Sequence, residues 1–395
     1  MRFAVTLLIL AATAGSLLAQ ERASGTPNDA AAYTIRGIAW AEKGENDKAI
    51  ADFNKAIRLD PTYARPYYTR GVVWVHKKQN DKAIIDFGEA IRLDPKFIAA
   101  YIYRGNVWEL KRDYDKAISD CNEAIQLDPS DASAYINRGA TWQLKQDYDK
   151  AITDYTEAIR LRPKNAMYYG NRGAVWQLKL DYDKAIADFS EAIRLDPKFA
   201  STYYSRGLVW VAKEDFDKAI ADNTEAIRLD PNHVDAHMNR GNAWRAKKDY
   251  DNAISDYTEG IRLNPKYALV YFNRGLVWHD KRDYDKAIAD FNEAKRLDPK
   301  DGRSINNLAR VLATAPDAKL RDGKRAVVLA KEAIQLDEKI AGYWDTLAAA
   351  YAEAGNFAEA VRWQERALED AALKNDADAR RRLELYRKKQ PYRQE

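Results

Sequence analysis

Few side chains in this sequence have the type and spacing that chemistry requires. His233 and His237 lie four residues apart with Asp235 between them, a spacing that could bind a metal ion from one helical face. His233, however, falls in an expected turn, and His237 stands where sibling segments carry tyrosine. Cys121 is the only cysteine, so no disulfide can form within the chain. We therefore interpret these residues as structural, Cys121 as buried and inert, and expect no metal and no cofactor.

Other signals of catalysis are missing from the sequence. It contains no glycine-rich phosphate loop, no nucleophile elbow and no Cys or His cluster with metal spacing. The formal net charge is +4 and 31% of the residues are charged, so both signs are plentiful and nearly balanced. This composition is typical of a solvated surface and not of a nucleic-acid-binding one. We expect a protein that is not an enzyme and does not bind nucleic acid.

The elements that position these residues repeat with a fixed period. The dipeptide Arg-Gly recurs every 34 residues, and a tryptophan follows each of its glycines by three places. A fixed period of this length predicts stacked structural repeats. The dipeptide begins at Arg36, Arg70, Arg104, Arg138, Arg172, Arg206, Arg240 and Arg274.

Each 34-residue segment reads as two helices. In residues 132–165, the first half places Tyr135, Arg138 and Trp142 on one helical stripe, and the second half has the same apolar spacing. Asp147 stands between the halves and is the expected N-cap of the second helix. The second helix is expected to end before the proline that closes the segment. Such a hairpin leaves apolar surface on both sides, so it must stack on its neighbours.

The segment resembles the tetratricopeptide repeat (TPR), whose 34-residue unit carries a small residue, Ala, an aromatic, Ala and Pro in this order. Here these positions are held by Gly139, Ala151, Tyr155, Ala158 and Pro163. The resemblance covers about residues 30–368 and implies an all-α fold, a right-handed α-solenoid superhelix of stacked helix-turn-helix units. It departs from the family pattern by an arginine where leucine is usual, and at single positions by Cys121, Asn223 and Gly260.

The sequence divides into five parts. The repeat register is strict through eight units, falters at Gly302 with five additional residues near 314–322, and recovers in a tenth unit. The expected parts are a signal peptide at 1–19, a flexible lead-in at 20–29, eight 34-residue TPR units at 30–301, two divergent TPR units at 302–368 and a basic capping helix or tail at 369–395.

The first residues predict export. Arg2 precedes an apolar run at 3–14, Gly15 and Ser16 break it, and Ala19 is a suitable last residue before cleavage. We expect a periplasmic or secreted protein. An uncleaved signal that anchors the chain in a membrane is the alternative.

A row of arginines is matched by a row of aspartates 16 residues later. Arg138 is matched by Asp154 and Arg172 by Asp188. One interpretation is a groove of arginines that captures carboxylates or phosphates; the other is a structural ion-pair ladder between helices. We favour the ladder, because the aspartates recur as regularly as the arginines. Each arginine also lies four residues before its tryptophan, so we expect its guanidinium to lie along that ring.

Function is expected on the face of the first helices, where the resemblance to TPR proteins implies an extended peptide or a partner helix as ligand. We predict a protein–protein interaction scaffold that binds its partner in the concave groove; a role in assembling an envelope complex is part of this prediction. The alternative is an envelope-associated spacer whose basic C-terminal tail binds an anionic surface. The oligomeric state is open. The groove candidates are Tyr68, Ile102, Asn106, Asn137, Gln143, Asn171, Gln177, Tyr204, Met238, Asn239, Asn242, Arg245, Phe272 and Asn273.

Overall fold

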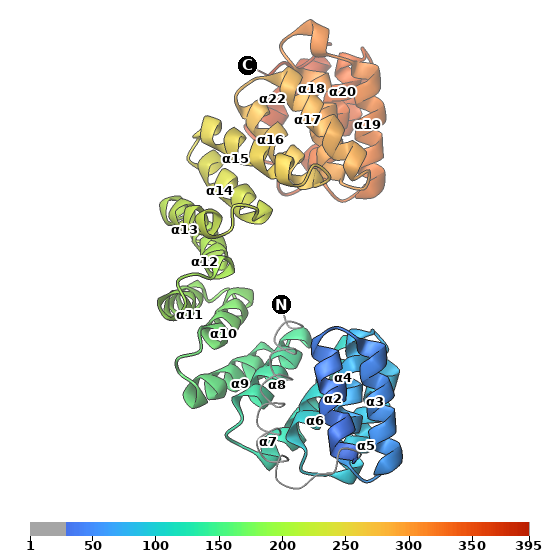
Figure 1. The fold of residues 1–395 in the computed structure, drawn as a ribbon. Coiled ribbons are helices and arrows are strands. Elements are labelled where there is room, and N and C mark those ends of the chain that lie inside the picture. The colour runs from blue at the N-terminus through green and yellow to red at the C-terminus, as the bar shows by residue number, and fades with distance from the viewer. Residues whose placement is uncertain (1–28, 395) are drawn as a thin grey trace. The chain divides into compact units, whose positions relative to one another are not determined.

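The computed structural model describes residues 29–394, and these residues are helical throughout, with short connections and no strand. They divide into two compact units, one ending at Pro197 and the other beginning at Lys198. We call residues 29–197 the N-terminal unit and residues 198–394 the C-terminal unit. In each, consecutive helices pair as antiparallel hairpins that pack on the next hairpin in sequence (Figure 1). The predicted all-α solenoid of stacked hairpins is confirmed. The expected signal peptide and nearly all of the lead-in lie outside the described residues.

The N-terminal unit consists of five hairpins. In each, a first helix of 13 residues is followed by a second helix of 14. The helices are α2 (Ala30–Glu42), α3 (Asn46–Leu59), α4 (Ala64–His76), α5 (Asn80–Leu93), α6 (Ile98–Leu110), α7 (Tyr114–Leu127), α8 (Ala132–Leu144), α9 (Tyr148–Leu161), α10 (Ala166–Leu178) and α11 (Tyr182–Leu195).

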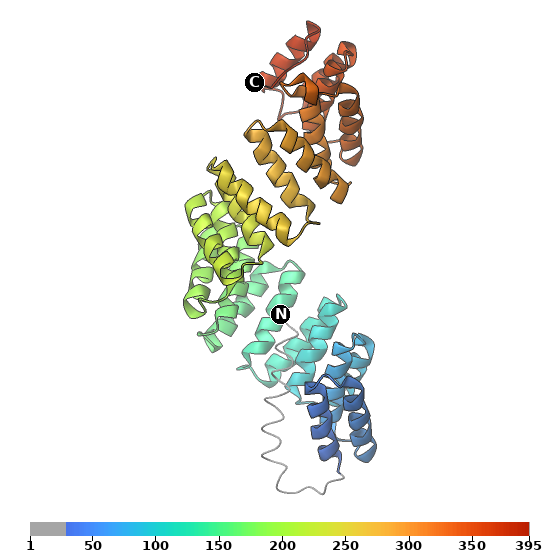
Figure 2. The same ribbon diagram turned by 45° about the horizontal axis from the view of Figure 1, so that its top comes forward.

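The C-terminal unit continues the pattern with five hairpins and one more helix (Figure 2). Its helices are α12 (Ala200–Ala212), α13 (Phe216–Leu229), α14 (Val234–Ala246), α15 (Tyr250–Leu263), α16 (Ala268–Asp280), α17 (Tyr284–Leu297), α18 (Gly302–Thr314), the 3₁₀ helix η1 (Ala318–Leu320), α19 (Gly323–Leu336), α20 (Ala341–Glu353), α21 (Phe357–Glu369) and α22 (Ala377–Arg387). The additional residues expected near 314–322 therefore form η1 and its flanks.

The turn within each hairpin follows from local chemistry. Between α8 and α9, Gln146 adopts a left-handed conformation with φ of 62°, and the N–H of Asp147 donates to the carbonyl of Trp142 at 2.9 Å. The Asp147 side chain then accepts from the N–H of Lys150, as expected of an N-cap. The second helix ends at Leu161, ahead of the closing proline.

The two helices of a hairpin cross where the glycine of the Arg-Gly dipeptide lies. A Cβ atom on Gly139 would lie 2.8 Å from Cε1 of Tyr155, so any side chain there would collide with the ring. Tyr155 is fully buried with Ala151 and Ala158. The glycine thus makes room for the aromatic ring that fills the interior of the hairpin.

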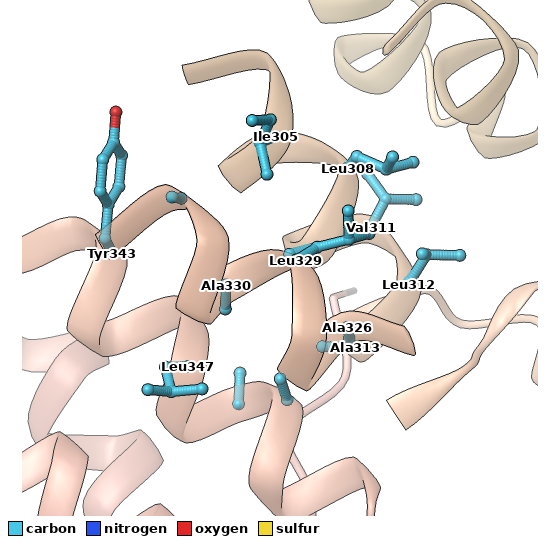
Figure 3. Close-up of a cluster of buried hydrophobic side chains, with 14 of the residues drawn as sticks. Ile305, Leu308, Val311, Leu312, Ala313, Ala326, Leu329, Ala330, Tyr343 and Leu347 are labelled. Atoms are coloured by element: carbon cyan, nitrogen blue, oxygen red, sulfur yellow. The ribbon is translucent and has the colours of Figure 1, made fainter. Parts of the chain in front are cut away.

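The last repeats have the richest apolar core. Figure 3 shows Leu308, Leu312, Leu329 and Leu347 of α18, α19 and α20 among buried side chains that form one cluster. Leucine replaces the arginine of the earlier repeats here, at Leu308 and Leu347. These repeats are therefore held by apolar packing where the first eight use ion pairs.

The helix α22 caps this core with a buried polar contact. Nε of Arg382 donates to Oδ1 of Asp345 at 2.9 Å, and Nε2 of Gln364 donates to the same oxygen at 2.7 Å. Arg382 is only 6% exposed. Within the expected basic capping segment at 369–395, Arg382 thus faces the core, where its charge neutralises a buried carboxylate. Arg387 likewise pairs with Glu365, at 2.7 Å.

Two of the first eight repeats carry a non-aromatic residue in the interior position of Tyr155. Cys121 is buried there, as expected, and burial raises the pKa of its thiol to about 12, so it stays protonated and unreactive. Asn223 is fully buried beside Gly207; its Nδ2 donates to the carbonyl of Ala219 at 2.7 Å. Its Oδ1 has no hydrogen-bond partner among the described residues. This repeat therefore holds an unsatisfied polar atom where its siblings hold a ring.

We predict that Asn223→Phe stabilises the C-terminal unit by about 1–3 kcal/mol, because it replaces an unsatisfied buried amide with apolar volume that sibling repeats accommodate beside the same glycine. The measurement is the midpoint of urea unfolding. The reverse change, Phe189→Asn, serves as the matched control and should lower the midpoint. A lower midpoint for Asn223→Phe would show that this repeat packs differently from its siblings.

Candidate functional site

The arginines of the first eight repeats pair with aspartates on the second helix of the same hairpin. In the fourth repeat, Nε and Nη2 of Arg138 donate to the two carboxylate oxygens of Asp154 at 2.9 and 2.6 Å. Arg172 binds Asp188 in the same two-pronged way. The other pairs are Arg36–Asp52, Arg70–Asp86, Arg104–Asp120, Arg206–Asp222, Arg240–Asp256 and Arg274–Asp290.

The same guanidinium also reaches the preceding repeat. Nη1 of Arg138 donates to Oδ1 of Asn122 on α7 at 2.7 Å, and Nη1 of Arg172 donates to Oγ1 of Thr156 on α9 at 3.0 Å. In the C-terminal unit, Arg240 and Arg274 make equivalent bonds to threonines on α13 and α15. Each such arginine therefore links three helices, because its side chain bonds from its own helix to the second helix of the same hairpin and to the second helix of the preceding repeat.

The Arg138–Asp154 pair contributes more to the arrangement of the helices than to the free energy of unfolding. Burial raises the pKa of the Asp154 carboxyl, and the Arg138 guanidinium lowers it only part of the way back. The carboxylate is thus costly to bury, and the arginine compensates for that cost without a large surplus. Removal of one partner would leave the other charge or its donors unsatisfied within the interface.

The prediction that each arginine guanidinium lies along the tryptophan ring of its own repeat is wrong. The guanidinium of Arg138 lies over the ring of Tyr135, 5.7 Å from its centroid. Trp142 is covered from the second helix by Lys150, whose Nζ is 4.3 Å from the ring centroid. The reason is that Asp154 fixes the guanidinium toward the second helix, on the side where the preceding turn places Tyr135.

The predicted groove candidates fall into a buried set and a partly exposed set. Four of these candidates are core residues and are corrected here: Tyr68, Ile102, Asn239 and Phe272 are each less than 9% exposed. Tyr68, for example, packs against the rings of Phe87, Phe97 and Tyr103 in its own and the next repeat. A ligand cannot reach these side chains without opening the stack.

The remaining candidates are partly exposed, and several already have polar partners. Oε1 of Gln143 accepts from the hydroxyl of Tyr155, and Oδ1 of Asn242 accepts from Tyr257 and from Asn273. Arg245 pairs with Asp280 at 2.9 Å. The other partly exposed candidates are Asn106, Asn137, Asn171, Gln177, Tyr204 and Met238.

Sequence analysis missed a set of exposed apolar residues at the ends of three first helices. Leu110, Leu144 and Leu178 are the last residues of α6, α8 and α10, and each is at least 50% exposed. Because these three helices contact one another in series, the leucines occupy equivalent places on adjacent helices. We call these three residues the leucine row. Other repeats place a polar or small residue at this position, a signal that it faces solvent; the equivalents are Glu42, His76, Ala212, Ala246 and Asp280.

Gly170 leaves open space on one face of α10, because glycine has no side chain. A Cβ atom on Gly170 would meet nothing within 4 Å. The equivalent residue of the preceding repeat, Ile136, is buried. Met167, one turn before Gly170, is 54% exposed. Exposed apolar residues therefore lie at the start of α10, Met167, and at its end, Leu178, with no side chain at Gly170.

The histidine pair has other partners. Nδ1 of His233 accepts from the N–H of Ala236 and caps α14, while Nδ1 of His237 lies 3.4 Å from Asp256 and its Nε2 lies 3.3 Å from the carbonyl oxygen of Pro231. Within residues 29–394, no group of three or more His, Cys, Asp or Glu side chains is placed to hold a metal ion. No helix in that range is both long enough and apolar enough to cross a membrane.

Comparison with known proteins was made at the level of family models and of solved structures. Models described as tetratricopeptide repeat match residues 64–97, 98–131, 132–165, 200–233, 234–267 and 268–301, and one described as TPR repeat matches 37–75 and 181–213. Together they cover more than half of the chain. No curated protein matches it.

Several solved structures are similar. A chain of the APC/C hetero-tetramer Cut9-Hcn1 is 15% identical with a TM-score of 0.50, over 90% of this chain and 76% of that one. Yeast Tom70 is 17% identical with a TM-score of 0.44, over 91% and 95%. YrrB, described as a TPR protein with an unusual peptide-binding site, is 24% identical with a TM-score of 0.42, over 47% and 96%. At these identities the likeness concerns the fold.

We predict that Asp154→Ala destabilises the N-terminal unit by about 2–3 kcal/mol, because it leaves the half-buried Arg138 guanidinium without its carboxylate. The matched control is Asp149→Ala on the same helix, which removes an exposed pair with Lys179 and should cost less than about 1 kcal/mol. The two midpoints of thermal unfolding are compared. Equal midpoints would exclude a structural role for the ladder.

Proposed function

The chain belongs to the tetratricopeptide-repeat family, and we propose that it is a non-catalytic scaffold that binds a partner protein through an extended or helical segment on the face of its first helices. TPR proteins generally mediate protein–protein interactions. The proposal for this chain adds the face, the residues and the chemistry of the segment. Its partners are proteins or peptides.

The leucine row is the observation that carries this proposal. Three large apolar side chains on adjacent helices are exposed, although the equivalent residue of other repeats is polar or small, as in Glu42, Ala212 and Asp280. A partner that covers them would bury apolar surface worth about 25 cal/mol per Å². A row with the spacing of neighbouring helices suits a segment that crosses several repeats and presents an apolar side chain to each of them.

Polar side chains beside the row suit the backbone of such a segment. Gln143 and Gln177 directly precede Leu144 and Leu178, and both are partly exposed. A side-chain amide offers a donor and an acceptor on one planar group, which matches the peptide group of a ligand. The neighbouring Lys145 and Lys179 are already paired with Asp115 and Asp149 of the preceding second helices, so they serve the stacking of the repeats. We therefore propose an apolar segment without strong charge as the partner of this face.

The spacer alternative, in which a basic C-terminal tail binds an anionic surface, has weaker support. Arg382, Arg387 and Arg393 are each paired with a carboxylate of the C-terminal unit. Their positive charge is largely neutralised within the protein. A role in envelope assembly stays part of the proposal only through the expected export of the chain.

A charged substitution within the leucine row tests whether these side chains bind a partner. We predict that Leu144→Glu weakens binding of peptides selected on the wild-type chain from a random library at least tenfold, because the carboxylate would have to be desolvated beneath an apolar ligand. Ile85→Glu is the matched control: Ile85 is 69% exposed on the second helix α5 of the same unit, and its replacement should leave the dissociation constant unchanged. Equal losses for both variants, or a library from which no peptide is enriched, would contradict the proposal.

Export is a separate proposal that rests on the sequence of residues 1–19 alone. We expect the mature protein to begin at Gln20, after cleavage behind Ala19, and to be recovered from the periplasm or the medium. Amino-terminal sequencing of protein from fractionated cells measures this. A cytoplasmic protein that retains Met1 would contradict export, and a membrane-bound one that retains Met1 would favour the uncleaved anchor.

A further inference from the structure

The last residues of the chain turn back onto the first helices of the C-terminal unit. Lys389, just beyond α22, has a left-handed φ of 55°, and the N–H of Gln390 donates to the carbonyl of Leu385 at 2.9 Å. Pro391 then prevents the helix from continuing. Residues 390–394, which we call the tail, therefore leave α22 as a non-helical strand of chain.

The tail contacts three successive first helices. The N–H of Gln394 donates to the carbonyl of Thr314 on α18 at 2.9 Å. The side-chain amide of Gln394 lies 3.1–3.3 Å from Nε2 of His279 on α16. Nη2 of Arg393 lies 2.6 Å from Oε2 of Glu353 on α20. A single short segment thus bonds to α16, α18 and α20 through both its backbone and its side chains.

Two of these three contacts fall on the helix positions that carry the leucine row in the N-terminal unit. Leu110, Leu144 and Leu178 end α6, α8 and α10, and in the same way Thr314 and Glu353 end α18 and α20. His279 is the last residue but one of α16. The tail therefore occupies in the C-terminal unit the face that is open in the N-terminal unit.

The face beneath the tail has the chemistry of a binding site. The Glu353 side chain is 14% exposed and lies between two arginines, Arg321 at 2.9 Å and Arg393 of the tail at 2.6 Å. The carbonyl of Thr314 belongs to the last turn of a helix, where carbonyls have no partner within the helix. Tyr392 packs on the apolar cluster of the unit, with the Arg382 guanidinium 5.5 Å from its ring centroid. The face thus accepts an aromatic ring, a cation, and an amide in sequence.

We propose that this face is a second peptide-binding site, specific for an extended segment with an aromatic residue followed by arginine and an amide side chain, and that the tail fills it until such a partner displaces it. The inference extends the proposed scaffold function to a site of different chemistry from the leucine row. A tethered segment acts at an effective concentration on the order of millimolar, so a free peptide of similar affinity competes poorly with it. A partner must therefore bind this face more tightly than the tail sequence itself does in order to displace the tethered tail.

The test uses the full chain and a fluorescent synthetic peptide with the sequence of residues 388–394, KKQPYRQ. We predict that Arg393→Glu, which places a carboxylate against Glu353 and releases the tail, lowers the dissociation constant of this probe at least tenfold relative to the wild-type chain. Addition of Glu353→Gln to Arg393→Glu should weaken the probe at least tenfold again. Arg387→Glu is the matched control, since its partner Glu365 is on α21, and it should behave as wild type.

Several outcomes would overturn the proposal. These are equal probe binding by the wild type and Arg393→Glu, no binding by Arg393→Glu while circular dichroism shows it folded, or equal binding of a probe in which glutamate replaces arginine. A concentration-dependent dimer of the wild type in light scattering would instead assign the face to the tail of a second copy. None of these results bears on the leucine row, which is tested with different variants and peptides.

Discussion

A buried two-pronged ion pair between arginine and aspartate is the interaction on which the repeat array depends. Arg138 binds Asp154 across its own hairpin and Asn122 in the hairpin before it, so one side chain sets the crossing of two helices and the contact between two repeats. The glycine that follows the arginine lets the helices approach closely enough for the bonds to form. The pair specifies geometry more than it adds stability, because burial of the carboxylate offsets much of the attraction.

The Arg–Asp pair lies away from the end of each first helix, where the leucine row is found in α6, α8 and α10. An α-helix turns about 100° per residue, so Leu144 lies about 120° around α8 from Arg138. The interior positions that lie between these two residues around the helix hold the buried core. The Arg–Asp pairs therefore do not involve the residue that ends each first helix, and its type is free to vary among the repeats. The chain uses that freedom in two ways: leucines in α6, α8 and α10, and polar groups that bind the tail in α18 and α20. One scaffold thereby presents two surfaces of different chemistry.

Much of this follows from the sequence, since the 34-residue period, the helical stripes and the capping aspartates are all local signals. The Arg–Asp pairing could also be inferred, because two rows of opposite charge recur in step. Two features of the structure could not be inferred from the sequence. The ring under each guanidinium depends on side-chain direction, so Arg138 lies over Tyr135 and Lys150 covers Trp142. Burial of Tyr68 or Arg382 depends on what the next repeat or the capping helix places against it, which no single repeat reveals. The leucine row could be found in the sequence only by asking at which helix position the residue type varies freely among the repeats.

The central claim, that arginine couples helices within and between repeats, is tested most directly by double-mutant cycles in the full chain. One cycle combines Arg138→Met with Asp154→Leu, and the other combines Arg138→Met with Asn122→Ala, each followed by urea unfolding. The account predicts coupling free energies of at least about 1 kcal/mol in the first cycle and a smaller, same-sign coupling in the second. Additive effects in both cycles would contradict it, because the repeats would then be held together by apolar packing alone.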